Sequence, residues 1–179
     1  MKVFFSGGCK NGKSTLAERV AKKLAEGGPM YYVATMIPRD REDRERVRRH
    51  VAERAGLGFI TLEQGTELCR CLERADVNGT FLMDSVTALL SNEMFRADGT
   101  MDENAPQRTA DALREFCSRV KNAVFVSDFI YADGADYDPW TEAYRRGLAL
   151  CDRTLTALSD TVVEVSLTCP TVYKGEWPL

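Results

Sequence analysis

The sequence lacks any long hydrophobic run, since no apolar stretch approaches the ~20 residues that a membrane-spanning helix needs. It also lacks an excess of positive charge: 24 Lys and Arg residues stand against 27 Asp and Glu residues, for a net charge of −3 at pH 7. This balance argues against a general nucleic-acid binder. No linker, repeat or low-complexity segment interrupts the chain, and its N-terminus leads straight into a strand-like run. We therefore expect one domain over residues 1–179, no membrane span, no nucleic-acid partner and a cytoplasmic location.

Zinc-binding patterns of histidine and cysteine are also missing. Histidine occurs once, at position 50, and the only close cysteine pair is Cys69-Arg70-Cys71, which has neither C-x-x-C spacing nor a nearby histidine. Reduced and mostly buried thiols are therefore expected rather than a zinc site or disulfides. The six cysteines are Cys9, Cys69, Cys71, Cys117, Cys151 and Cys169.

The strongest motif present is G-x-x-x-x-G-K-S at residues 7–14. A β-branched and aromatic run at 2–6 precedes it, and a segment of helical periodicity at 15–24 follows, which is the setting of a phosphate-binding loop. Lys13 is then expected to reach the β- and γ-phosphates, and Ser14 to hold Mg²⁺. The alternative, a glycine-rich turn between two core elements, leaves this combination unexplained. The predicted nucleotide-binding residues of the loop are Gly7, Gly8, Cys9, Lys10, Asn11, Gly12, Lys13 and Ser14.

The rest of the chain alternates strand-like and helix-like segments. Most of the strand-like runs are continuously apolar, which predicts an α/β fold with an open, mainly parallel sheet and helices on both faces, of the P-loop NTPase, RecA-like type. The expected strands cover residues 2–6, 30–35, 56–62 (an edge strand), 80–84, 123–128 and 161–167, and the expected helices cover 15–24, 38–54, 66–75, 86–94, 102–121 and 141–158.

Ligand sites in such sheets lie at the carboxyl ends of the strands, which places the 7–14 loop, Thr35, Asp84 and Asp128 along one edge. Asp84 closes an apolar strand, a position from which a carboxylate orients Mg²⁺ in phosphate-loop enzymes. The alternative role is a helix N-cap, which Asp84 or Ser85 could serve, and the two roles are compatible. The sequence thus predicts Ser14 and Asp84 as metal ligands.

His50 lies in a densely charged segment whose only apolar seam is Val47 and Val51. Arg46 and Arg54, one turn away on either side, could bind phosphates. A neutral imidazole, with an intrinsic pKa of ~6.5, is also a competent nucleophile toward phosphorus near pH 7. A solvated bystander is the alternative, and the spacing alone does not decide between them.

Several segments within the first 95 residues carry a family resemblance. Besides the phosphate loop, they are 32–35 (Y-V-A-T), R-x-x-x-H at 46–50, 59–63 (F-I-T-L-E) and D-x-V-T-x-L-L-x-N at 84–92. The R-x-x-x-H and D-x-V-T-x-L-L-x-N segments are the most specific. In this order they resemble the bifunctional adenosylcobinamide kinase and adenosylcobinamide-phosphate guanylyltransferase family of cobalamin biosynthesis.

The resemblance implies two reactions. Such an enzyme phosphorylates the aminopropanol hydroxyl of adenosylcobinamide with ATP or GTP. It then takes GMP from GTP onto a histidine and passes it to the new phosphate. His50 would be that histidine and Lys13 the catalytic lysine, with Mg²⁺ as cofactor, a corrinoid and nucleotides as partners, and a homotrimeric assembly. The implied nucleotide site also includes Thr35, Arg49, Glu63 and Asp84.

The second half departs from the family pattern. Residues 128–131 read D-F-I-Y where many members carry N-E-V-G, and Asp152 stands where they carry Asn. A kinase on a related substrate with an idle His50 is therefore one alternative, and a non-catalytic nucleotide-binding module is another, although the N-K-x-D guanine reader of a switch protein is absent. The loop at 131–140 could wall a substrate pocket or merely cover the core.

Overall fold

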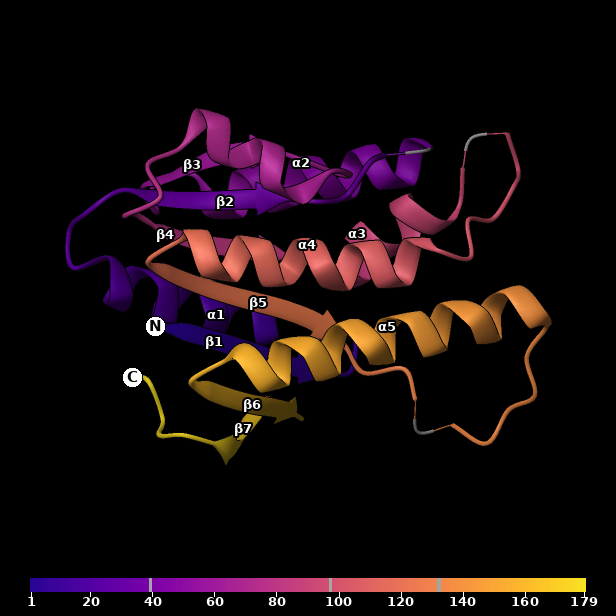
Figure 1. The fold of residues 1–179 in the computed structure, drawn as a ribbon. Helices are drawn as coiled ribbons and strands as arrows, with labels where there is room; N and C mark the ends of the chain where they lie inside the picture. The colour runs from indigo at the N-terminus through magenta and orange to yellow at the C-terminus, as the bar shows by residue number, and fades with distance from the viewer. Residues whose placement is uncertain (39, 97, 132) are drawn as a thin grey trace.

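A seven-stranded sheet forms the centre of the protein, seen in a computed structural model that describes residues 1–38, 40–96, 98–131 and 133–179 (Figure 1). Within helix α2 it does not describe the side chains at positions 46, 49, 50, 53 and 54. The strand order is β3-β2-β4-β5-β1-β6-β7, and every described pairing is parallel except that of β7 with β6. The strands are β1 (Lys2–Gly7), β2 (Met30–Ala34), β3 (Phe59–Glu63), β4 (Thr80–Asp84), β5 (Asn122–Asp128), β6 (Thr161–Ser166) and β7 (Cys169–Lys174).

Helices cover both faces of the sheet. In Figure 1, α4 and α5 lie in front of it and α1 lies behind. The expected open, mainly parallel α/β fold is confirmed, and β3 is an edge strand as predicted. The helices are α1 (Lys13–Ala25), α2 (Arg41–Arg54), α3 (Val86–Met94), α4 (Ala105–Arg119) and α5 (Pro139–Leu158), with a 3-10 helix, η1 (Leu68–Arg74).

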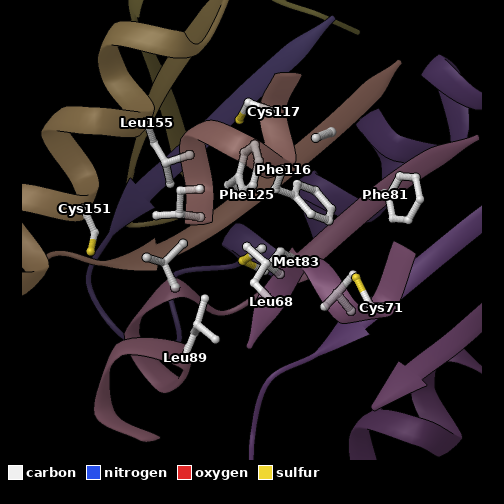
Figure 2. Packing of buried hydrophobic residues seen from close by; sticks show 14 of the residues in the cluster. Leu68, Cys71, Phe81, Met83, Leu89, Phe116, Cys117, Phe125, Cys151 and Leu155 are labelled. Atoms are coloured by element: carbon white, nitrogen blue, oxygen red, sulfur yellow. The ribbon is translucent and has the colours of Figure 1, made fainter. Parts of the chain in front are cut away.

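The larger core cluster lies between the sheet and the layer of α3, α4, α5 and η1. Figure 2 shows its aromatic centre, where the Phe116 ring packs edge-on against Phe81 and Phe125 at centroid distances of 5.4 and 6.1 Å. All three rings are fully buried, and burying each stabilises the fold by roughly 1.5–3 kcal/mol. This packing fixes the central strands on which the site is built.

The strand register brings the carboxyl ends of the strands together. Gly7 lies opposite Asp128 on one side and Val165 on the other, and Ala34 lies opposite both Asp84 and Glu63. Strands β2, β4, β5 and β1 are successive parallel neighbours in the sheet, so the glycine loop and both strand-terminal aspartates share one edge.

Several elements differ from the sequence prediction: β3, α2 and α4 begin three residues later than expected, and three further elements differ as follows. The helix expected at 66–75 is the shorter 3-10 helix η1. No strand was predicted after residue 167, yet β7 folds back on β6 through Leu167 and Thr168, which both take left-handed backbone angles without being glycine. Helix α5 starts two residues earlier than expected because the Asp138 carboxylate accepts hydrogen bonds from the first backbone N–H groups and Pro139 suits the first turn.

Membrane helices are not found in the part of the chain that the structure describes: each helix there is too short or too polar to cross a bilayer.

Candidate active site

The glycine loop follows β1 and leads into α1, as its motif predicts. Gly7 sits so close to β6 that a Cβ atom on it would lie 2.2 Å from the carbonyl oxygen of Val165. Gly12 is the N-cap of α1 with φ +81°, and as a glycine it offers no side chain to accept a hydrogen bond from the N–H groups of the first turn. Those N–H groups and the positive end of the helix dipole suit a bound anion.

Lys13 is the buried cation of this loop, with only 5% of its surface exposed. Its Nζ donates hydrogen bonds to the carbonyl oxygen of Gly8 at 2.6 Å and to Oδ1 of Asp128 at 3.0 Å. The ammonium therefore lies inside the curve of the loop, where an ammonium can bind phosphate oxygens.

Asp128 is the site residue whose pairing the sequence did not reveal. It ends β5 directly opposite Gly7, and the carbonyl oxygen of Gly7 accepts a hydrogen bond from the N–H of Phe129 at 2.9 Å. The N–H of Asp128 donates to Oγ1 of Thr87 on α3, also at 2.9 Å. The sequence did signal that Asp128 lies at the site, because Asp128 closes an apolar strand in the same way as Asp84.

Asp84 ends β4, and its Oδ2 accepts a hydrogen bond from the Tyr32 hydroxyl at 2.9 Å. The neighbouring Ser85 serves as the N-cap of α3 by accepting from the N–H of Ala88, so the cap role falls to Ser85 rather than to Asp84. The carboxylate is thus oriented by Tyr32, a residue that sequence reasoning missed because it lies within a buried apolar strand.

The two predicted metal ligands offer oxygens, from the half-buried Ser14 hydroxyl and from the Asp84 carboxylate at the end of β4. Among the described residues, no group of three or more His, Cys, Asp or Glu side chains lies close enough together to hold a metal by itself. This composition fits Mg²⁺, which uses one or two protein ligands and completes its shell with water and substrate phosphates.

Two of the predicted nucleotide contacts, Thr35 and Glu63, lie in different surroundings. Thr35 is fully buried: its hydroxyl donates to the carbonyl oxygen of Ser85 and accepts from the N–H of Ser85, both at 2.7 Å. Thr35 therefore ties β2 to the turn after β4. Glu63 is exposed at the end of the edge strand β3. Their roles toward a nucleotide stay predictions.

His50 and Arg49 belong to α2, which begins at an Asp40 N-cap. Their side chains lie outside the described residues, so the structure brings neither of them to the glycine loop nor separates them from it.

Comparison with known proteins decides the family. A model of the family described as cobinamide kinase / cobinamide phosphate guanyltransferase matches residues 3–172. The chain belongs to this family. It is accordingly an enzyme that phosphorylates adenosylcobinamide and transfers a guanylyl group in cobalamin biosynthesis. No curated protein matches the sequence.

Solved structures share the fold at low sequence identity. The flagellar accessory protein FlaH from Methanocaldococcus jannaschii is 11% identical, with a TM-score of 0.52 over 99% of this chain and 79% of that one. A protein from Pyrococcus horikoshii OT3, titled Project ID PH0250, is 8% identical, with a TM-score of 0.52 over 98% and 87%. These likenesses concern the fold alone.

Two departures from the family pattern in the second half lie in contact with each other. They are Tyr131 and Asp152, where the resemblance implied glycine and asparagine, and the Tyr131 hydroxyl donates to Oδ2 of Asp152 at 2.9 Å. Burial raises the pKa of Asp152 to about 6 and also raises the pKa of Tyr131. Half-buried Tyr131 and buried Asp152 thus form one hydrogen-bonded pair.

Arg145 fixes the loop that leads from β5 to α5 (Figure 1). Its guanidinium donates to the carbonyl oxygens of Ile130 and Tyr131 and to the carboxylate of Asp133, at 3.2, 3.3 and 3.1 Å. It also lies 4.7 Å from the ring centroid of Tyr137. Several contacts therefore hold the backbone and side chains of this loop to one guanidinium beyond the carboxyl end of β5.

Proposed function

We propose that this family member performs both reactions with one triphosphate site and one covalent intermediate on His50. The observation that carries the proposal is the buried Lys13 ammonium, held inside a glycine loop at the N-terminus of α1. An uncapped helix N-terminus and an enclosed ammonium together suit a polyphosphate. In the kinase reaction, Lys13 and the loop N–H groups would hold the β- and γ-phosphates of ATP or GTP.

Ser14 and Asp84 would hold Mg²⁺, with Tyr32 fixing the orientation of the carboxylate. When bound, the ion offsets the charge of the β- and γ-phosphate oxygens. The fit of the oxygen donors supports this assignment.

The guanylyl transfer would use His50 as a nucleophile. A ring nitrogen of His50 attacks the α-phosphorus of GTP, a P–N bond forms, and pyrophosphate leaves with the electrons of the broken P–O bond. An oxygen of the cobinamide phosphate then displaces the histidine and restores the imidazole. The position of His50 in the R-x-x-x-H segment supports this role, and the neighbouring Arg49 would offset charge on the moving group.

A homotrimer is part of the same proposal. Helix α2 has a thin apolar seam, and Val51 on it is 50% exposed. A neighbouring subunit would cover that seam and support the helix that carries His50. We also infer a cytoplasmic location, where nucleoside triphosphates are abundant.

The test is to incubate the purified protein with adenosylcobinamide and GTP and to identify the corrinoid products by mass. The proposal predicts the phosphate and then the GDP derivative in the wild type, neither in Lys13→Ala, and the phosphate alone in His50→Ala. Accumulation of the phosphate alone in the wild type would favour a kinase without guanylyl transfer. No product, together with tight nucleotide binding, would favour a non-catalytic module.

A further inference from the structure

A carboxylate beside a phosphate-binding lysine has an electrostatic cost. Oδ1 of Asp128 lies 3.0 Å from Nζ of Lys13, so its charge lies close to the place where the γ-phosphate would bind. Two negative groups close together repel each other, and a neutral side chain at this position would avoid that repulsion. A chemical role of the Asp128 carboxylate would explain why this unfavourable charge is present.

The position of Asp128 is fixed from several sides. Its backbone N–H donates to Thr87 of α3, and Lys13 at the start of α1 donates to its carboxylate. From α5, Tyr144 and Asp152 face it closely enough to interact electrostatically, with burial and then the Asp128 charge raising the pKa of Tyr144. About a third of the Asp128 side chain stays exposed (32%), so a substrate can reach it.

We propose that Asp128 is the general base of the kinase reaction in this chain. The proposal deepens the family's kinase activity and rests on it. As the acceptor hydroxyl oxygen attacks the γ-phosphorus, its O–H bond breaks and the proton passes to the Asp128 carboxylate. A new P–O bond forms, the bond from the γ-phosphorus to the β–γ bridging oxygen breaks, and the nucleoside diphosphate leaves with that electron pair. The proton then returns to solvent.

Two other described carboxylates are less suited. Asp84 is bonded to Tyr32 and is the proposed metal ligand, and Asp152 is 92% buried behind β5, where Tyr131 occupies one of its oxygens. Of the two strands that flank β1, β6 places Val165 opposite Gly7, whereas β5 places Asp128 there.

The guanylyl transfer offers an internal control, because its acceptor is a phosphate oxygen that carries no proton to remove. The experiment compares wild type, Asp128→Asn and Asp111→Asn in both half-reactions. Asp111 is an exposed aspartate of α4 that pairs with Arg114 and lies outside the site. Phosphorylation is measured with adenosylcobinamide and ATP, and guanylyl transfer with adenosylcobinamide phosphate and GTP.

We expect Asp128→Asn to lower kcat for phosphorylation by about 10²-fold or more. Its KM for ATP should stay unchanged or fall, because a negative charge near the triphosphate is removed. Guanylyl transfer by this variant should lose much less activity than phosphorylation, because it uses the same triphosphate site but needs no proton removed from its acceptor. Both reactions of Asp111→Asn should keep close to the wild-type rates.

Four results would overturn the role of Asp128. Phosphorylation by Asp128→Asn at the wild-type rate would mean that the carboxylate only tethers Lys13. Equal losses in both half-reactions, or a raised KM for ATP with kcat intact, would indicate a structural role. A wild-type protein that transfers GMP but does not phosphorylate adenosylcobinamide would contradict the proposal together with the kinase function on which it rests.

Discussion

Replacing Asp152 with asparagine should stabilise the protein at neutral and alkaline pH. Asp152 is 8% exposed, and its Oδ1 finds no hydrogen-bond partner among the described residues, whereas Oδ2 accepts from Tyr131. Asparagine has nearly the same shape, and its carbonyl oxygen can still accept from Tyr131. The substitution also removes the negative charge of Asp152, whose burial costs free energy.

The magnitude follows from the pKa of Asp152, which burial raises from its ordinary value of 3.8 to about 6. The folded state therefore holds the proton of Asp152 more tightly than the unfolded state. The stabilisation that this proton contributes is fully present below pH 3.8 and is lost as the pH rises through 6. A shift of about two units corresponds to about 3 kcal/mol above pH 7. For a chain of 179 residues, that gain corresponds to a rise in Tm of roughly 6–12 °C.

The assay is urea denaturation of wild type and Asp152→Asn at pH 8 and at pH 4, with tryptophan fluorescence as the probe. We expect a gain of up to about 3 kcal/mol in the free energy of unfolding at pH 8, falling to roughly 0.5 kcal/mol at pH 4. Carboxylates that do not interact with Asp152 contribute equally in both proteins, so their contributions cancel. A variant that is no more stable than wild type at pH 8, or whose gain is the same at both pH values, would refute the reasoning.

Three further substitutions test other parts of the structure. Lys13→Ala should lower kcat of the kinase reaction by about 10²-fold or more, as steady-state rates with ATP would reveal; an unaffected rate would remove this lysine from the site. Gly7→Ala drives a methyl group into β6 and should lower the unfolding free energy by about 2 kcal/mol, whereas Gly134→Ala, whose Cβ meets nothing within 4 Å, should change it by less than about 0.5 kcal/mol. Thr35→Val removes both bonds to Ser85 and should cost about 1–3 kcal/mol in urea denaturation; an unchanged midpoint would mean that these bonds contribute nothing.

Much of the fold was predictable because its central strands are continuously apolar and its helices carry clear apolar faces. The run at 80–84 is almost wholly buried in β4, and α4 presents Leu113 and Phe116 to the core. The glycine loop was predictable because spacing and setting agree there. Hairpin formation by β7 was not, because Leu167 and Thr168 adopt left-handed angles that glycine or asparagine usually takes.

The site was predictable in position but not in its contacts. Strand ends placed Asp84 and Asp128 at one edge, yet no local pattern pairs Lys13 with a residue 115 positions away. The hydroxyl of Tyr32 on Asp84 depends in the same way on two strands meeting in register. Such pairings are set by tertiary packing, which a single sequence does not encode locally.

The most direct test of the covalent two-step account is incubation of the protein with GTP labelled at the α-phosphate, followed by denaturation and treatment with acid or base. The account predicts a protein-bound label that is stable in base, labile in acid, absent in His50→Ala and discharged by adenosylcobinamide phosphate. A wild-type protein that forms cobinamide-GDP without ever carrying the label, or a label that persists in His50→Ala, would contradict it.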